Sequence, residues 1–342
     1  MLSALYGQVL EWRSRLYASG RLRSEKLPGP VVSVGNLTFG GTGKTPFTEH
    51  LARRFRFEGR RPAILSRGYG RRSRGVVLVS EGNGPRVAPD EGGDEPVALA
   101  RRLPGVIVVV AERRIDAARE AARLGADLFL LDDGYQHLSV RRDANILLLD
   151  ARDPFGGGRL PPRGRLREPL TAMERADVIV FTRAGRDAPQ AAARRTVALL
   201  APGVPVFTAR IRAAGLWEES GAAVESAALS GRRLIAVCGV ANPGSFESSL
   251  READLTPEDL LVFPDHRRYR PRDLRRIRRS AEDAGAAFVV TTEKDAVKLS
   301  GSLGLPILTL RLSVEILEAG FFGLLASRLE ESAPGRQPKA GA

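Results

Sequence analysis

The chain has 342 residues, of which 43% are hydrophobic and 27% are charged, so it can bury a large core and is not an intrinsically disordered protein. A net charge of +13 favours an anionic partner, which includes nucleic acid, phospholipid headgroups and phosphorylated substrates. The single cysteine, Cys238, excludes an internal disulfide and a zinc site built from several cysteines.

Membrane-spanning helices are not expected, because no apolar run approaches the roughly 20 residues that cross a bilayer. The N-terminal stretch also differs from a signal peptide, since Glu11, Arg13 and Arg15 interrupt its apolar residues. We therefore expect a cytoplasmic protein.

Residues 1–23 are predicted to form an amphipathic helix with apolar side chains on one side and arginines around the other. A basic amphipathic helix can lie in a membrane interface. It can equally pack on its own domain. The aromatic residues at both ends of the segment favour the membrane, and the second interpretation stays open.

Residues 24–204 show short apolar runs that alternate with helical patterns, which is typical of a parallel sheet covered on both faces. The predicted strands are Val31–Val34, Ala63–Ser66, Val106–Ala111, Leu128–Leu131, Ile146–Leu149 and Val178–Phe181. The sequence therefore predicts an α/β domain with a parallel sheet resembling that of P-loop NTPases.

Residues 205–331 repeat this alternation and predict a second, smaller α/β domain. The strands expected there are Val206–Ala209, Leu234–Cys238, Phe288–Thr291 and Ile307–Leu310. Between the last two strands of the first series, residues 154–169 are rich in Gly, Pro and Arg and are interpreted as a functional loop. The small, polar tail at 332–342 is expected to be disordered.

A glycine-rich segment between the first strand and the helix after it predicts a phosphate-binding loop. The segment is Thr38, Phe39, Gly40, Gly41, Thr42, Gly43, Lys44 and Thr45, with threonine where the strict pattern begins with glycine. Its glycines allow backbone amides to turn toward phosphate oxygens. Lys44 is expected to reach the β- and γ-phosphates of ATP, and the Thr45 hydroxyl to bind Mg²⁺.

Two acids follow the strand Leu128–Leu131 and should emerge at the carboxyl edge of the sheet, beside the phosphate-binding loop. Asp132 and Asp133 could hold Mg²⁺ there, directly or through water. The polar run Gly134–His137 directly after them strengthens the prediction of a functional site.

Asp94 precedes another helical pattern, and it has two interpretations. It can be a helix N-cap, or it can be the base that accepts a proton from an attacking hydroxyl. His266 is one of three histidines and could orient such a carboxylate across a cleft between the domains. Sequence alone does not establish that the two side chains pair.

Several segments together resemble the tetraacyldisaccharide 4'-kinase family of lipid A biosynthesis, and their order and spacing match over residues 1–330. These segments are Val34–Thr38 with the following GGTGKTP, Leu65–Gly70, Gly93–Pro96, Asp132–His137, Leu166–Glu168 and Pro264–His266. The segment Thr292–Lys298 matches a further family motif, for which a structural or nucleotide-side role is suggested.

The resemblance implies roles for individual residues. Asp94 corresponds to the proposed general base and His266 to the histidine that assists it. Asp132, Asp133 and Glu168 match acidic positions near the metal, while Gln136 and Arg167 match polar positions around the phosphates. Tyr69 and Arg71 fall at the substrate side of the cleft.

The resemblance also implies an activity: transfer of the ATP γ-phosphate to the 4'-hydroxyl of a tetraacylated glucosamine disaccharide 1-phosphate, a lipid A precursor. The expected location is peripheral, on the anionic inner face of the bacterial inner membrane. Neither a nucleic acid nor a protein partner is expected.

Two alternatives remain open at this point. A nucleic-acid-stimulated ATPase would also suit the positive charge, although no nucleic-acid-binding module is recognisable and aromatic residues make up only 6%. A peripheral membrane protein regulated by nucleotide is the other, although the acids at positions 94, 132, 133 and 168 exceed what a switch needs.

Overall fold

A computed structural model describes residues 2–184, 190–225, 229 and 231–331. The expected disordered tail lies outside these described residues. Below, the P-loop part means residues 24–204 and the C-terminal part means residues 205–331. The division into domains at these boundaries stays a prediction.

Every strand expected from the sequence is present. The strands of the P-loop part are β1 (Val31–Asn36), β2 (Pro62–Ser66), β3 (Val77–Ser80), β4 (Ile107–Val110), β5 (Leu128–Asp132), β6 (Ala144–Asp150) and β7 (Val178–Thr182). Those of the C-terminal part are β8 (Val206–Trp217), β9 (Ala223–Val224), β10 (Leu234–Cys238), β11 (Leu260–Val262), β12 (Phe288–Thr292) and β13 (Ile307–Ile316). Strands β3, β9 and β11 were not expected; each is short and partly exposed.

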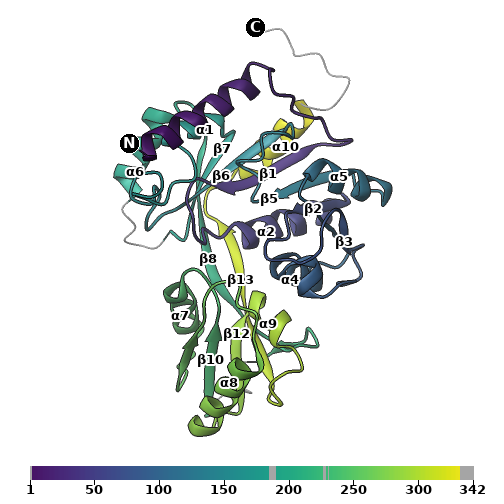
Figure 1. Cartoon of the computed structure of the whole chain (residues 1–342), viewed down its shortest axis with the longest axis vertical. Helices are drawn as coiled ribbons and strands as arrows, with labels where there is room; N and C mark the ends of the chain where they lie inside the picture. The colour runs from purple at the N-terminus through teal and green to yellow at the C-terminus, as the bar shows by residue number, and fades with distance from the viewer. Residues whose placement is uncertain (1, 185–189, 226–228, 230, 332–342) are drawn as a thin grey trace.

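The helices alternate with these strands along the chain. They are α1 (Leu2–Ala18), α2 (Lys44–Phe57), α3 (Pro89–Gly92), α4 (Asp94–Arg102), α5 (Arg114–Arg123), α6 (Gln190–Leu200), α7 (Pro243–Glu252), α8 (Pro271–Ala284), α9 (Glu293–Leu299) and α10 (Phe321–Glu331), with a 3₁₀ helix η1 at Leu170–Arg175. Figure 1 shows the two parts joined by β8 and β13.

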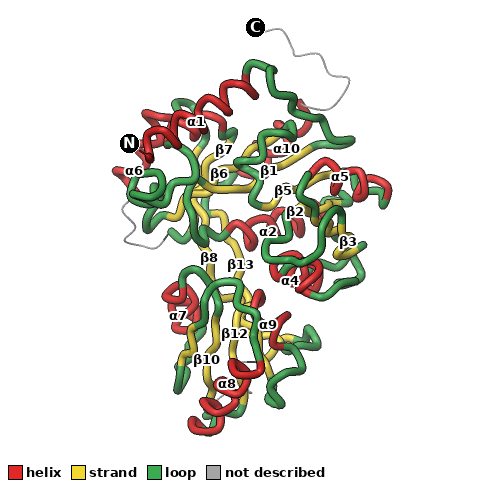
Figure 2. The backbone as a smooth tube through the Cα atoms, in the orientation of Figure 1, coloured by secondary structure: helices red, strands yellow, loops and turns green. Residues whose placement is uncertain are grey.

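A single sheet runs through both parts in the strand order β11-β10-β12-β13-β8-β7-β6-β1-β5-β2-β4-β3, with β9 beside β8. Neighbouring strands are parallel except in the pairs β3–β4, β8–β13 and β8–β9. The expected α/β fold is confirmed, and its two α/β units share one sheet. In Figure 2 the long strands β8 and β13, which belong to the C-terminal part, run on from the sheet of the P-loop part.

Strands β8 and β13 extend well beyond the segments predicted from the sequence, which ended at Ala209 and Leu310. The physical reason is the exposure of the added residues. Beyond Ala209 and Leu310, more buried and more exposed residues alternate, so arginines such as Arg210 and Arg212 interrupt the apolar pattern. A prediction that recognises strands by continuous apolar runs therefore ends both strands too early.

Helices cover both faces of the sheet in the P-loop part. Alternate residues of β1 illustrate this, because Val32 packs in a core with α2, α4 and α10, while Val31 packs in a core with α5 on the other face. Helix α10 belongs to the first core although it ends the described chain. Its Phe321 meets Phe47 of α2 edge to face, with ring centroids 5.9 Å apart.

Between the two parts, a largely buried ionic network joins α2, α4, α9 and β13. Arg102 pairs with Glu293 and places its Nη2 2.8 Å from Glu49 Oε1. Arg311 Nε lies 3.7 Å from Glu293 Oε1. Burial raises the pKa of Glu293 from its ordinary 4.5 to about 7, and the neighbouring arginines offset only part of that effect.

We expect this glutamate to make stability depend on pH. Because its pKa is higher in the folded chain, its contribution is full below about pH 4.5 and is lost as pH rises through about 7. Glu293→Gln cannot titrate, so its free energy of unfolding, measured with denaturant, should change less between about pH 5 and 8 than that of the wild type. Glu315→Gln, at an exposed position of β13, should keep the wild-type slope. Equal slopes for Glu293→Gln and wild type would contradict the prediction.

Candidate active site

The glycine-rich loop after β1 takes the conformation that phosphate binding needs. Gly40 and Gly43 have φ values of 115° and 83°, in the left-handed region that glycine favours. A side chain at Gly43 would also collide with Ile211, because a Cβ there would lie 2.2 Å from Cδ1. Helix α2 begins at Lys44, so its first amides are available to an anion.

Strand β7 and its following loop fix the outer side of this turn. The Thr182 hydroxyl donates a hydrogen bond of 2.8 Å to the carbonyl of Thr42. The Arg183 guanidinium donates to the carbonyl of Gly41 and pairs with Asp150 at 2.8 Å. Two loop carbonyls therefore point toward β7 and the residue that follows it. This arrangement favours a loop whose amides point away from β7.

Lys44 and Arg167 meet at one carboxylate beside the loop. Asp133 places Oδ1 2.7 Å from Arg167 Nη1 and 3.7 Å from Lys44 Nζ. Burial would raise the pKa of Asp133, but these two cations outweigh it and hold the pKa below its ordinary value. Gln136 joins the group, since its Oε1 lies 3.5 Å from Arg167 Nη1.

Asp132 lies deeper and has the opposite electrostatics. Its Oδ1 accepts a hydrogen bond of 3.2 Å from the Thr48 hydroxyl. Burial and the nearby charges of Glu95 and Asp133 raise its pKa to about 7. A bound cation would favour its ionised form.

The residues present fit a Mg²⁺ ion that binds together with a nucleotide. Within the described ranges, no group of three or more His, Cys, Asp or Glu side chains is arranged as a metal centre. Mg²⁺ commonly takes one or two protein oxygens and completes its shell with phosphate and water. The Thr45 hydroxyl at the start of α2 and the carboxylate of Asp132, whose ionised form a cation would favour, provide such oxygens.

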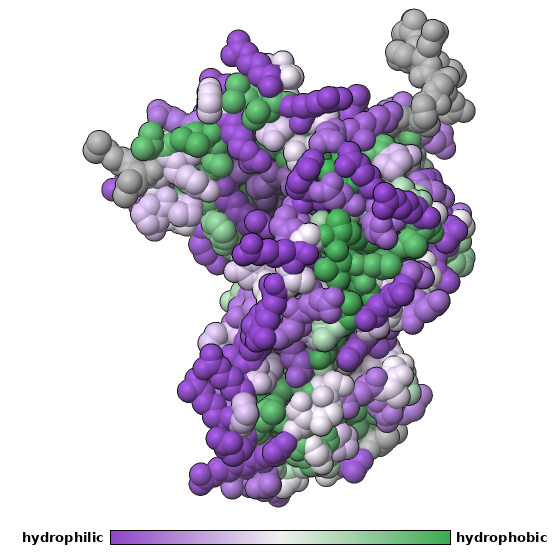
Figure 3. Space-filling model, turned by 45° about the vertical axis from the view of Figure 1, so that its right-hand side comes forward, coloured by the Kyte–Doolittle hydropathy of each residue, from purple (hydrophilic) through white to green (hydrophobic). Residues whose placement is uncertain are grey.

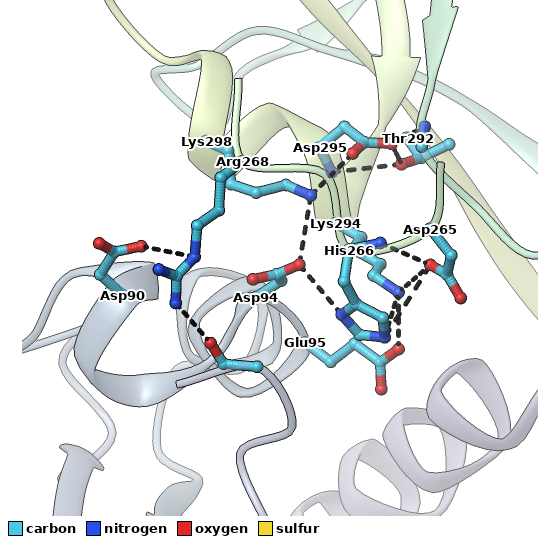
Figure 4. Close-up of polar contacts among 12 residues, drawn as sticks. Asp90, Asp94, Glu95, Asp265, His266, Arg268, Thr292, Lys294, Asp295 and Lys298 are labelled. Atoms are coloured by element: carbon cyan, nitrogen blue, oxygen red, sulfur yellow. Dashed lines mark hydrogen bonds and ion pairs between the residues drawn. The ribbon is translucent and has the colours of Figure 1, made fainter. Parts of the chain in front are cut away.

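Asp94 meets His266 across the gap between the two parts, as the sequence hypothesis required (Figure 4). Asp94 is the first residue of α4, and its Oδ2 lies 3.3 Å from His266 Nδ1. Lys294 Nζ lies 2.9 Å from Nε2 of the same ring. Burial lowers the pKa of Lys294, but Glu95 and Asp265 outweigh burial and hold it above its ordinary value.

These contacts assign the histidine tautomer. A protonated lysine only donates hydrogen bonds, so His266 Nε2 must accept and Nδ1 must carry the ring proton. The ring therefore donates Nδ1–H to Asp94. Tyr69 lies against the same ring, with centroids 4.7 Å apart.

Glu95 connects the phosphate-binding loop to this pair. Its Oε2 accepts from the Thr45 hydroxyl over 3.2 Å, and its Oε1 lies 3.5 Å from Lys294 Nζ. The expected metal-binding threonine is thus linked to the expected base through Glu95, Lys294 and His266. Sequence reasoning assigned Glu95 no role, although its position beside Asp94 was the available signal.

Two predicted residues make contacts elsewhere. Glu168 is buried and pairs with Arg175 of η1, so its contacts do not join it to the acids after β5. Arg71 is buried along its side chain and binds Glu112 Oε1 at 2.7 Å and the carbonyl of Gly75. These contacts brace the loop that carries Tyr69. The assignments of Glu168 to metal and Arg71 to substrate stay untested predictions.

A cavity of about 510 Å³ borders the phosphate-binding loop on the side of β7 and β8. Its lining was not predicted from the sequence and is rich in arginine and serine: Arg152, Arg183, Ala184, Arg210, Ile211, Arg212, Ser245, Ser248, Ser249, Glu252 and Leu312. Arg183 and Ile211 are shared with the loop contacts described above. The cavity therefore lies next to the expected phosphates.

The fold and this loop define a class of protein: an α/β enzyme with a P-loop that binds nucleotide. Comparison with known proteins is more specific. The sequence model of the family described as tetraacyldisaccharide-1-P 4'-kinase matches residues 1–330. A tetraacyldisaccharide 4'-kinase of Pelobacter propionicus is 45% identical over 302 residues, covering 87% of this chain and 82% of that protein.

Two further proteins agree. A tetraacyldisaccharide 4'-kinase of Geobacter sulfurreducens is 43% identical over 321 residues, which is 92% of this chain and 88% of the relative. A crystal structure of LpxK from Aquifex aeolicus in complex with ATP is 35% identical, with a TM-score of 0.78 over 96% of this chain and 97% of that one. The chain belongs to the tetraacyldisaccharide 4'-kinase family, and it is an ATP-dependent kinase of lipid A biosynthesis. These findings do not favour the ATPase and the nucleotide-switch alternatives.

Proposed function

We propose that Asp94 is the base in the transfer of the ATP γ-phosphate to the 4'-hydroxyl of a tetraacylated glucosamine disaccharide 1-phosphate. The observation that carries this proposal is the link from Thr45 through Glu95 and Lys294 to His266 and Asp94. It brings a carboxylate from α4 beside a phosphate-binding loop, with a histidine from the other part of the chain as its partner. An acceptor hydroxyl in that gap would meet both.

Electrostatics supplies most of the expected acceleration, because phosphoryl transfer needs little covalent help from an enzyme. Lys44 and Arg167 converge on Asp133 beside the loop and are placed to neutralise charge on the transferring phosphate. Thr45 and Asp132 would hold Mg²⁺. When bound, the ion would neutralise negative charge that develops on the phosphates.

The nucleoside end of ATP fits the cavity bordered by β7 and β8. That cavity begins where Arg183 holds the loop carbonyl of Gly41, so a nucleotide whose phosphates lie in the loop can extend into it. Its serine and arginine side chains offer polar partners for a ribose. We therefore assign the phosphates to one side of the loop and the nucleoside to the other.

A transfer assay tests the proposed reaction. Purified wild-type protein, ATP labelled at the γ-phosphate, Mg²⁺ and tetraacyldisaccharide 1-phosphate should yield labelled lipid on a thin-layer plate, and chelation of Mg²⁺ should stop the transfer. Added RNA should not stimulate release of free phosphate. Hydrolysis of ATP without labelled lipid would contradict the assignment.

The N-terminal helix supports a location at a membrane surface. Among the described helices, none combines the length and hydrophobicity that a bilayer crossing requires. Helix α1 instead packs through Gly7, while Leu5, Val9 and Trp12, spaced along one face, are exposed. Figure 3 shows hydrophilic side chains interspersed with hydrophobic patches over the visible face. We propose that α1 lies in an anionic membrane interface.

Vesicle sedimentation checks this placement. Leu5→Ser combined with Trp12→Ser should reduce binding to vesicles that contain anionic phospholipid, because the buried apolar area is lost. Binding by the wild type should weaken with salt, since each nearby Arg or Lys contributes about 1 kcal/mol at low ionic strength. Leu199→Ser removes a comparably exposed leucine elsewhere and should leave binding unchanged. Unaltered sedimentation of the double variant would refute the anchoring role.

A further inference from the structure

Lys298 is a buried cation that the reaction described above does not use. It lies on α9 with its side chain only 8% exposed, and it contacts two carboxylates. Its Nζ is 3.2 Å from Asp94 Oδ2 and 2.9 Å from Asp295 Oδ1. Figure 4 shows it between these two acids, opposite the side from which His266 approaches Asp94.

Asp295 is itself fixed, so it can hold the lysine in place. It is fully buried, and its Oδ2 accepts hydrogen bonds from the backbone amide of Gly239 and the hydroxyl of Thr292, each over 2.7 Å. The ring of Tyr269 lies 5.5 Å from Lys298 Nζ. The lysine is therefore confined between a rigid acid and an aromatic ring.

The hydrogen bonds to Asp94 reach one oxygen only. Lys298 and the Nδ1–H of His266 both donate to Oδ2. Among the residues that the structure describes, no hydrogen bond reaches Oδ1. Two donors from the C-terminal part thus fix the carboxylate and leave its second oxygen able to accept a proton.

We propose that Lys298 is a positioning residue for the transfer, which holds Asp94 through Oδ2 so that Oδ1 is the atom that receives the proton. The inference rests on the proposed role of Asp94 as base and adds the means by which it is oriented and kept ionised. The acceptor O–H bond breaks and its proton passes to Oδ1. The oxygen bonds to the γ-phosphorus, and the bond from that phosphorus to ADP breaks.

The charge environment of Asp94 follows the same geometry. Burial raises its pKa, but the hydrogen bond from His266 and the charge of Lys298 outweigh burial and keep the pKa below 3.8. The charged or titratable groups around it are His266, Lys298, Lys294, Asp295, Asp265 and Glu95, with the uncharged Tyr69 against the histidine. Without Lys298, burial would be opposed only by the hydrogen bond from His266 and by the more distant charge of Lys294.

The decisive test is the pH dependence of kcat at saturating MgATP and lipid. Lys298→Met keeps the length of the side chain and removes its charge. We expect its acid limb to move up by about 1 pH unit or more relative to wild type, because an opposite charge at this distance lowers a carboxyl pKa by about that amount. The titration of ATP is common to all variants, and KM for ATP should change little.

Two further Lys298 variants protect the test from a folding defect, and a third variant serves as a control. In Lys298→Met with Asp295→Asn, the fully buried carboxylate at position 295 is not left without its cation, so this variant should fold and still show the shifted limb. Lys298→Arg should restore part of the wild-type profile. Arg268→Met removes a cation that pairs with Asp90 on the same surface, and its profile should match wild type. If Lys298→Met, alone and combined with Asp295→Asn, lowers kcat without shifting the acid limb, the proposal is overturned.

Asp94→Asn separates this inference from the proposed function. If that variant keeps near-normal turnover, Asp94 is not the base and the proposed function is wrong at this residue. If it loses turnover while the Lys298 variants keep the wild-type limb, the base assignment stands and the positioning role of Lys298 is rejected.

Discussion

Lys44→Ala is expected to remove most turnover, lowering kcat by about 100-fold or more, as loss of one preorganised charge-stabilising donor typically does. The lysine opens α2 directly after the glycine turn and lies 3.4 Å from Asn36 Oδ1 and 3.7 Å from Asp133 Oδ1. Its ammonium group is therefore held at the loop by neighbouring acceptors. The measurement is steady-state transfer to the lipid acceptor.

The matched control is Lys26→Ala, which removes an exposed lysine outside the loop and should leave kcat unchanged. Circular dichroism of both variants should match wild type. A turnover near normal for the Lys44 variant would mean that phosphate is not bound at this loop, and the assignment of the active site would fail.

Asp94→Asn should lower kcat by about 100-fold or more, because general acid–base catalysis typically contributes 10²- to 10⁴-fold. The apparent KM for ATP should change little, since the carboxylate contacts His266 and Lys298 and no loop amide. Asparagine keeps the shape of the side chain but cannot accept the proton. Steady-state kinetics with ATP and lipid varied separately would measure both quantities.

Asp90→Asn is the corresponding control, because it makes the same change four residues before Asp94, in the preceding helix α3. Asp90 is half exposed and pairs with Arg72 and Arg268. We expect it to retain near-wild-type kcat. A similar loss in both variants would show that the effect of Asp94→Asn comes from disturbing α3 and α4 and not from the chemistry.

The sequence was most informative where a local pattern has a single structural meaning. The glycine spacing and Lys44 placed the loop between β1 and α2, and the apolar run before Asp132 placed that acid at the carboxyl end of β5. Parallel strands buried on both faces also produced clear signals. These features depend on neighbours in the chain, so periodicity and motif are sufficient to find them.

The sequence was least informative about contacts between distant residues. The Lys298–Asp94 contact spans 204 positions, and the buried pair of Arg102 with Glu293 spans 191. The motif Thr292–Lys298 drew attention to this lysine, but its contact with Asp94 results from the packing of α9 on α4, which no local pattern reveals. For the same reason the sequence did not reveal that Arg71, which the motif places at the substrate side of the cleft, forms an ion pair with Glu112.

A crystal structure with Mg²⁺ and an ATP analogue that cannot be hydrolysed at the γ-phosphate tests the central claim most directly. The account predicts the γ-phosphate at Lys44, Mg²⁺ at the Thr45 hydroxyl and Asp132, and Asp94 Oδ1 facing the space beside the γ-phosphorus. Phosphates bound away from the glycine loop, or Asp94 turned away from the γ-phosphorus, would contradict it.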